Sequence, residues 1–309
     1  MNNILEYEKK SIISESYPVL LTVEPTNYCN LKCRMCPREL QSHRRGMMDM
    51  NVFRKIVDES HGLSTHMWLH YMGEPLLNPN IFQMIKYATD RAIKVGISTN
   101  GTLLNDEFVG RLANAGLALI IISLDASTPE TYDLIRGERE YFAAIETGTE
   151  QLIKKLSQDN SNTHVCIQFV CQTGNAHERA PFLERWKQHK RPGVSIVVKG
   201  LVDWGGQLDY TDLGMTRSVS KHPSSCTEPY RTLVIHWNSN VSPCCYDYDH
   251  KHNLGNVNDQ TIREIWNGIP MQNIRRGFLE NNPVGICKRC DGMNSIDLFR
   301  DEFNSYISA

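Results

Sequence analysis

Three cysteines within eight residues, in the run CNLKCRMC, constrain this sequence more than any other feature. Cys29, Cys33 and Cys36 follow a short apolar stretch, and their thiolates can converge on one metal centre. Iron–sulfur clusters are held by cysteine thiolates, and three ligands would leave one metal position open. A zinc site completed by a distant fourth ligand is the alternative that the spacing leaves open.

A second group of four cysteines lies in the last third of the chain. Cys226, Cys244, Cys287 and Cys290 are separated by steps of 18, 43 and 3 residues, and the last pair forms the knuckle CKRC. Four thiolates would close the coordination shell, so this centre would not bind substrate directly. Structural zinc and an iron–sulfur cluster both fit this spacing.

Cys245 directly follows a proposed ligand, in the run SPCCYDYD. Neighbouring side chains in a chain usually point in different directions, so the two cysteines need not bind the same metal. A thiol that faces the substrate is the functional interpretation of Cys245. An inert thiol, or the true ligand with Cys244 spare, is the alternative. Cys166 and Cys171 flank a predicted strand and are expected in the core.

Charge and hydropathy exclude several classes of protein. The chain has 33 basic and 35 acidic residues, a net charge of −2, which gives no electrostatic reason to expect nucleic acid as a partner. The longest mainly apolar stretch, residues 117–124, is too short to cross a bilayer. The first residues lack an apolar signal region, so we expect a cytoplasmic protein, with reduced thiols that bind metal or do chemistry.

The first two thirds of the chain alternate between short apolar strands and helices, which predicts parallel βαβ units. This α/β pattern fits a doubly wound open sheet and a partial barrel equally well. After residue 205 the sequence becomes more polar, and only 262–266 and 271–279 are expected to be helical. The predicted strands are 19–24, 66–71, 95–99, 118–124, 165–170 and 194–198, and the predicted helices lie near 51–60, 81–91, 106–115, 143–156 and 181–189.

The order of these motifs resembles the radical S-adenosylmethionine (SAM) family. CNLKCRMC is similar to its Cys-x₃-Cys-x₂-Cys signature, MGEP at 72–75 to its Gly-Gly-Glu motif, and STNG and SLDA to later motifs. The resemblance implies a partial (β/α)₆ TIM-like barrel over residues 17–205. It also implies a [4Fe–4S] cluster on the first three cysteines, with SAM on the open iron, and a 5′-deoxyadenosyl radical that abstracts hydrogen from a C–H bond.

The same resemblance assigns cofactor-binding residues. Gly73 and Glu74 should contact the amino group of SAM, since a carboxylate suits an ammonium and a glycine permits close approach. Ser123 and Arg136 are candidates for its carboxylate, and Asn100 for its ribose. Two departures from the family pattern stand beside these assignments. Met35 replaces a common aromatic residue, and Met72 replaces the first glycine of Gly-Gly-Glu.

The C-terminal run SPCCYDYD…LGNV…IREIW…ICKRC resembles a SPASM or twitch domain, which would occupy residues 206–309. Because no cysteine follows Cys290, the resemblance implies one auxiliary [4Fe–4S] cluster, for two clusters in all. The quartet is most similar to that of 2-deoxy-scyllo-inosamine dehydrogenases, in which the auxiliary cluster accepts an electron. Cys245 departs from the aromatic residue expected there, and epimerases of the wider family use such a thiol to return hydrogen.

We therefore expect a radical SAM oxidoreductase or epimerase acting on a sugar-like or aminocyclitol-like small molecule, with Cys245 as hydrogen donor in the second case. Peptide modification is the alternative, although no extra N-terminal domain is available to grip a leader peptide. Asp247 is the expected general base, with Asp249, His250, Lys199 and Asp203 as alternatives. A flavodoxin- or ferredoxin-type protein is the expected electron donor. A zinc-stapled binding protein and a thiol–disulfide oxidoreductase fit the motifs less well.

Overall fold

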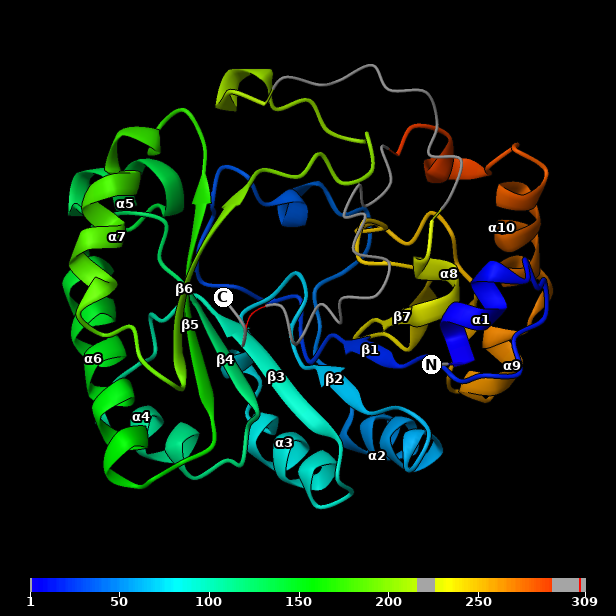
Figure 1. Cartoon of the computed structure of the whole chain (residues 1–309), viewed down its shortest axis with the longest axis horizontal. Coiled ribbons are helices and arrows are strands. Elements are labelled where there is room, and N and C mark those ends of the chain that lie inside the picture. The colour runs from blue at the N-terminus through cyan, green and yellow to red at the C-terminus, as the bar shows by residue number, and fades with distance from the viewer. Residues whose placement is uncertain (1, 216–225, 291–305, 307–309) are drawn as a thin grey trace.

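The structure is a computed structural model that describes residues 2–215, 226–290 and Tyr306. Its centre is a nine-stranded sheet with the strand order β6-β5-β4-β3-β2-β1-β7-β8-β9 (Figure 1). The first six strands lie in sequence order, and each is parallel to its neighbours. Their bounds are β1 Leu20–Val23, β2 His66–Trp68, β3 Lys94–Thr99, β4 Leu119–Ser123, β5 His164–Cys171 and β6 Val194–Gly200.

Helices connect these strands along the outer side of the sheet (Figure 1). A strand order that never reverses, combined with right-handed crossovers, puts the helices on one face, as in a barrel. A doubly wound sheet would need a reversal. The α/β fold is thus the partial barrel that the family resemblance implied. The helices are α2 Met50–Ser60, α3 Ile81–Thr89, α4 Asp106–Ala113, α5 Pro129–Arg136, α6 Phe142–Gln158 and α7 Arg179–Lys187.

Short polar side chains begin several of these helices. The Asp49 carboxylate accepts a hydrogen bond from Asn51 N at 2.7 Å, and Asn105 Oδ1 accepts one from Phe108 N at 3.0 Å. Thr128 caps α5 in the same way and is followed by proline at the first helical position. Such caps satisfy backbone donors that have no partner inside the helix. These local signals explain why the predicted helix starts agree with the structure to within two residues.

The two faces of the sheet have separate cores. Strands β1, β2 and β4 are buried along their whole length. On the outer face, residues such as Leu21, Met67 and Ile120 pack against the helices in one large cluster. On the inner face, a small cluster contains Leu20, Trp68, Leu119, Ile121, Cys166 and Tyr306. Cys166 is fully buried there, as expected for a thiol that packs as a small hydrophobe.

The C-terminal part of the chain continues the same sheet, which the sequence analysis did not predict. Strand β7 (Thr232–Ile235) pairs in parallel with β1, and β8 (Asn240–Ser242) and β9 (Gly255–Asn256) follow in antiparallel pairing. Helices α1 (Asn2–Glu8) and α8 (Glu228–Arg231) were also missed. The expected helices near 262–266 and 271–279 are present as α9 (Ile262–Trp266) and α10 (Ile269–Leu279).

The sheet therefore crosses the predicted boundary between residues 205 and 206. That boundary stays a prediction, and residues 216–225, 291–305 and 307–309 of the second predicted domain lie outside the described residues. Among the helices that the structure describes, none combines the length and hydropathy needed to cross a bilayer. The described residues also include short 3₁₀ helices at Pro37–Leu40, Pro75–Leu77, Arg139–Tyr141, Ala176–Glu178, Thr211–Leu213 and Gly285–Lys288.

Candidate active site

The three-cysteine loop lies beyond the carboxyl end of β1, over the ends of the neighbouring strands. Asn100, just after β3, donates from Nδ2 to Cys29 Sγ at 3.7 Å, and Arg136 Nη1 donates to Cys33 Sγ at 3.5 Å. Burial, with smaller contributions from the nearby Cys33 and Cys29 thiols, raises the pKa of Cys36 to about 12. The three thiols therefore lie near enough to one another to interact electrostatically, as expected of cysteines that serve one centre.

Gly73 lies where the turn after β2 passes under this loop. A Cβ atom at this position would lie 2.2 Å from Thr26 O and 2.6 Å from Tyr28 O, both backbone atoms. Glu74 N donates to the same Tyr28 carbonyl at 2.8 Å. The glycine therefore permits the Gly-Glu turn to pack directly against the start of the cysteine loop.

Glu74 is buried and bonded to the end of β3. Its Oε1 accepts from Thr99 Oγ1 at 2.8 Å, and its Oε2 accepts from Asn100 N at 2.7 Å. Burial raises the pKa of Glu74 to about 7, although these hydrogen bonds favour the ionised form. A carboxylate in this state gains from a cation placed beside it.

Asn100 is oriented by a small polar network. Its Nδ2 also donates to Asn30 Oδ1 at 2.9 Å, and its Oδ1 accepts from Thr102 N at 2.9 Å. The side chain is thus held against the cysteine loop. Its expected contact with ribose stays a prediction.

Arg136, at the end of α5, forms an ion pair that sequence reasoning missed. Its Nη2 lies 2.5 Å from Asp125 Oδ2, and both side chains are buried. Burial by itself would lower the pKa of Arg136, but Asp125 and the Cys33 thiol reverse the shift and raise it. Asp125 belongs to the SLDA motif, so the signal was present in the sequence, and its φ of 61° marks a special backbone position.

Ser123 lies on the inner face at the end of β4. Its hydroxyl is 3.3 Å from Ser98 Oγ on β3 and accepts from Gln168 Nε2 on β5 at 3.3 Å. These three side chains make a polar row across three adjacent strands. The carboxyl ends of parallel barrel strands are where active sites form.

The second group of cysteines lines one hollow of about 510 Å³, part of which is open to solvent. Cys226, Cys244, Cys287 and Cys290 all contribute, with an apolar wall that includes Ile274 and Phe278. Burial raises the pKa of Cys287 to about 12 and those of Cys226 and Cys244 well above the ordinary value. Buried thiols gathered in this way fit a metal centre, which would hold them as thiolates.

Cys245 lines this hollow and also a second one of about 470 Å³ on the inner face of the barrel. The barrel hollow is lined as well by Trp68, His70 and Tyr71. Tyr71 donates its hydroxyl proton to the Cys245 carbonyl at 2.8 Å, which fixes the backbone at this point. Cys245 therefore lies between the four-cysteine hollow and the barrel interior.

Asp247, two residues further on, is fully buried and bonded to its own loop. Its carboxylate accepts from Lys251 N at 2.8 Å and from His252 N at 2.7 Å. These bonds stabilise the loop that carries Cys244 and Cys245. Asp249 accepts from Ser42 N at 2.6 Å and so connects this loop to the chain that follows the first cysteine group.

Comparisons with known proteins agree with this geometry. The radical SAM superfamily model matches residues 23–170, and the SPASM model, an iron–sulfur cluster-binding domain, matches residues 226–291. The first match contains all of the SAM-binding candidates, and the second contains the four-cysteine group. Proteins with these domains use SAM with a [4Fe–4S] cluster and hold auxiliary iron–sulfur clusters. The thiol groups described above fit both cofactors.

Relatives with known names cover most of the chain. A tungsten-containing aldehyde ferredoxin oxidoreductase cofactor-modifying protein from Pyrococcus furiosus is 25% identical over 291 residues, 80% of each chain. The S-adenosyl-L-methionine-dependent 2-deoxy-scyllo-inosamine dehydrogenase of Niallia circulans is 23% identical over 93% of this chain and 97% of its own.

Solved structures share the fold at low sequence identity. BtrN in complex with AdoMet and 2-DOIA matches with a TM-score of 0.62 and 19% identity, over 90% of this chain and 94% of its own. Streptococcus suis SuiB bound to precursor peptide SuiA matches with a TM-score of 0.69 and 17% identity, over 97% and 78%. The domain matches, together with the two cysteine groups, show that the chain contains a radical SAM domain followed by a C-terminal SPASM domain.

Proposed function

We propose that this radical SAM enzyme removes hydrogen from a C–H bond of a polar, sugar-like or aminocyclitol-like small molecule and completes either an epimerisation or a dehydrogenation. The position of Cys245, at the wall between the four-cysteine hollow and the barrel interior, carries this proposal. A thiol there can meet a substrate held in the barrel. A cluster on the four cysteines would lie on the other side of the same loop.

The proposal assigns the cofactors to residues. Cys29, Cys33 and Cys36 would hold the [4Fe–4S] cluster that binds SAM, and Cys226, Cys244, Cys287 and Cys290 would hold one auxiliary [4Fe–4S] cluster. When bound, these groups supply a 5′-deoxyadenosyl radical and a one-electron acceptor. Glu74, beside Gly73, would bind the amino group of SAM, Arg136 and Ser123 its carboxylate, and Asn100 its ribose.

The residues around the barrel hollow support a polar substrate. His70 Nδ1 accepts from Ser98 N at 3.1 Å, and burial lowers the pKa of His70 to about 3. The ring is therefore neutral, with its proton on Nε2, where it can donate to an oxygen of the substrate. Thr22 adds a hydroxyl group, and the Tyr71 hydroxyl oxygen, whose proton is donated to the Cys245 carbonyl, can still accept a hydrogen bond. The likeness to the Niallia circulans dehydrogenase also supports a cyclitol-like substrate.

In the epimerisation branch, the Cys245 S–H bond breaks and a C–H bond forms on the opposite face of the substrate radical. The thiyl that remains needs one electron and one proton to become a thiol again, which a flavodoxin- or ferredoxin-type donor would supply. In the dehydrogenation branch, the substrate radical would lose one electron, which a cluster held by the four C-terminal cysteines would accept, and one proton, which would pass to solvent. The bonds of Asp247 to its own loop favour a supporting role for this carboxylate over that of general base.

Peptide modification is the second candidate, because the fold is also that of SuiB bound to its precursor peptide. A panel of aminocyclitols and short peptides separates the two substrate classes by product analysis. We also propose the cytoplasm as the compartment, since a reducing environment keeps ten cysteines available for clusters.

The test of the cofactor assignment is a count of iron, sulfide and zinc in anaerobically reconstituted protein, with SAM cleavage followed under dithionite. We expect about eight irons and eight sulfides per chain, as two [4Fe–4S] clusters require. Cys33→Ala should abolish cleavage to 5′-deoxyadenosine, while the matched control Cys166→Ala should retain it. Normal cleavage by Cys33→Ala would contradict the assignment. Four irons with zinc on the C-terminal group would remove the dehydrogenation branch.

The role of Cys245 is tested in D₂O with whichever member of the panel is turned over. Its thiol proton exchanges with solvent, so an epimerised product should carry one deuterium at the inverted carbon. Cys245→Ala should cleave SAM but lose this product. An unchanged product from Cys245→Ala would show that the thiol takes no part.

A further inference from the structure

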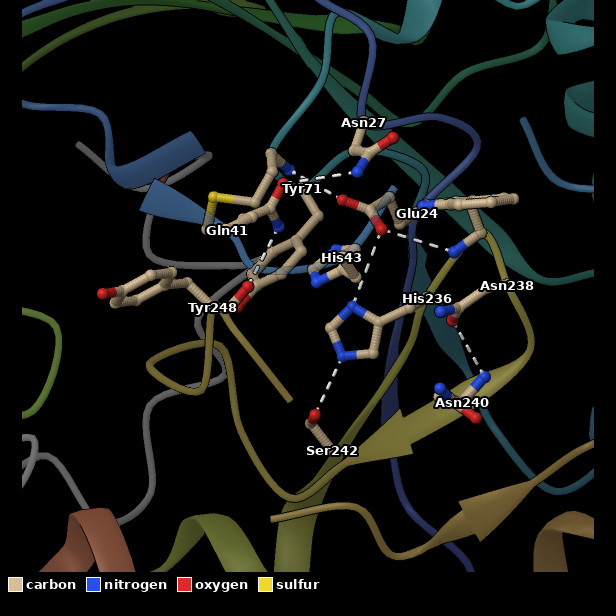
Figure 2. Close-up of polar contacts among 12 residues, drawn as sticks. Glu24, Asn27, Gln41, His43, Tyr71, His236, Asn238, Asn240, Ser242 and Tyr248 are labelled. Carbon is tan, nitrogen blue, oxygen red and sulfur yellow. Dashed lines mark hydrogen bonds and ion pairs between the residues drawn. The ribbon is translucent and has the colours of Figure 1, made fainter. Parts of the chain in front are cut away.

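A largely buried group of one carboxylate and two imidazoles lies beside the Gly73–Glu74 turn and includes none of the cysteines. Glu24 follows β1, His236 follows β7, and His250 lies in the loop after the Cys244–Cys245 pair. Their potential ligand atoms all lie within 4.8 Å of one another. Glu24 and His236 are fully buried. Figure 2 shows the Glu24 carboxylate pointing toward the His236 ring, whose far edge meets Ser242.

The hydrogen bonds at this group leave ring nitrogens unpaired. His236 Nε2 lies 2.8 Å from Ser242 Oγ, so Nδ1 is the atom that faces Glu24 Oε2, at 3.6 Å. That separation is too long for a hydrogen bond. Among the described residues, His236 Nδ1 and His250 Nε2 have no hydrogen-bond partner. A buried polar atom without a hydrogen-bond partner costs free energy, and nearly all buried polar atoms in protein interiors have a partner.

The neighbours of the group are also polar. His43 stacks on His250 with ring centroids 4.0 Å apart, and neither of its buried nitrogens has a hydrogen-bond partner among the described residues. Asp249 Oδ1 lies 3.5 Å from His43 Nδ1. Glu24 accepts long hydrogen bonds of 3.3 Å from the backbone nitrogens of Met72 and Trp237. The group thus has a carboxylate beside two imidazoles whose ring centroids lie 3.5 Å apart, with a third imidazole stacked on His250.

The separation of 3.6 Å between His236 Nδ1 and Glu24 Oε2 matches a pair of metal ligands better than a hydrogen bond. Ligand atoms bound tetrahedrally at 2.0–2.2 Å from zinc lie about 3.3–3.6 Å apart. Two imidazoles and one carboxylate suit divalent first-row transition metals, and they leave a position for water or a further ligand. The bond between His236 and Ser242 is the outer-shell contact that orients a ligating imidazole.

We propose that Glu24, His236 and His250 bind a divalent first-row transition ion of the zinc type, with His43 or water in the remaining position. This site is separate from both cysteine groups and is assigned from the geometry of the three side chains. The ion would join three segments: the end of β1, which leads into the cysteine loop, the turn after β7, and the loop that carries Cys244 and Cys245. It would thereby hold the C-terminal loop against the barrel.

The test uses the anaerobically reconstituted protein with its iron and sulfide at full occupancy, treated with a chelator, desalted and then titrated with zinc alone. We expect about one zinc per chain beyond the cluster metals, by elemental analysis. Glu24→Gln and His250→Asn should weaken zinc binding at least tenfold. The exposed His61, which is remote from the group and bonds to the Arg91 carbonyl at 3.1 Å, supplies the control His61→Asn, which should bind zinc like the wild type.

A second variant keeps the test decisive if the ligand variants fold poorly. Ser242→Ala leaves all three ligands and should still weaken zinc binding roughly 10–100-fold, as loss of an outer-shell partner does. Iron in excess of sulfide that disappears in Glu24→Gln would support the site with iron(II) as its ion. Absence of any bound ion in the wild type, or zinc retained equally by Glu24→Gln and His250→Asn, would overturn the proposal.

Discussion

Glu74 shows how one side chain can be stabilised in the protein and still be ready for a ligand. Its carboxylate oxygens accept hydrogen bonds from three donors in nearby segments: Leu76 N, Thr99 Oγ1 and Asn100 N. Burial nevertheless raises its pKa to about 7, so its negative charge is only partly compensated. A positively charged amino group placed beside it would complete the compensation.

This balance predicts that SAM affinity depends on pH. Because the pKa of Glu74 is raised, the ionised form is lost as pH falls below about 7, while an α-amino group loses its proton near 8. The affinity for SAM should therefore be highest between pH 7 and pH 8. The Kd at pH 6 should be about fivefold higher than the Kd at pH 7.5.

Calorimetry on the reconstituted protein measures this effect. The Glu74→Gln variant should bind SAM weakly and without the loss on the acid side. Equal affinity of the wild type at pH 6 and pH 7.5 would exclude Glu74 as the partner of the amino group.

At the scale of the elements, two segments that are distant in sequence pack directly against each other. The loop after β1 carries the first cysteines, and the turn after β2 carries Gly73 and Glu74. The carbonyls of Thr26 and Tyr28 occupy the space that a Cβ on residue 73 would need. The position of the cysteine loop therefore depends on a glycine in another element.

We predict that Gly73→Ala displaces the cysteine loop and destabilises the protein by about 1–3 kcal/mol, as overpacking against fixed atoms does. The variant should also hold less iron after reconstitution. Denaturant unfolding and an iron count measure the two effects.

Gly110→Ala is the matched control, because outside the chain neighbours and the backbone of its own helix α4 no atom lies within 4 Å of the added Cβ. It should raise stability by about 0.5–1 kcal/mol, as alanine does in a helix. If Gly73→Ala kept full iron and wild-type stability, the close packing of the turn under the loop would be refuted.

At the scale of the whole molecule, one sheet joins the barrel to the SPASM part. Strand β7 pairs with all four residues of β1, from Leu20 with Thr232 to Val23 with Ile235. The tie between Tyr71 and the Cys245 carbonyl adds a second connection. The two parts matched by separate family models therefore share one framework.

A chain that ends at residue 215 should accordingly be unstable. It would expose β1 as an edge strand whose residues are buried in the full protein, and exposed apolar edges promote aggregation. We expect oligomers or precipitate in size-exclusion chromatography with light scattering. The full-length variant Cys287→Ser/Cys290→Ser keeps the sheet and should stay monodisperse while losing auxiliary iron. A monodisperse, cooperatively unfolding truncated chain would contradict this view.

The sequence by itself determined the features that are local along the chain. The run CNLKCRMC, the knuckle CKRC and the alternation of apolar strands with capped helices depend on neighbours a few residues apart. Spacing and periodicity record such neighbours directly. The family resemblance rested on these motifs, and it was the resemblance that implied the partial barrel. The structure agrees on this fold.

Only the tertiary structure decided the contacts between distant residues. Glu24 and Trp237, 213 positions apart, are joined by a hydrogen bond, and the ion pair of Asp125 with Arg136 forms because a strand end faces a helix end. Strand β7 has too few residues for its sequence pattern to indicate which strand it pairs with, so its pairing with β1 was not predicted. A side chain's partner is set by how elements pack, and packing leaves no periodic trace in the sequence. For this reason the cysteine motifs could be recognised in the sequence, while the group of Glu24, His236 and His250 could not be predicted from it.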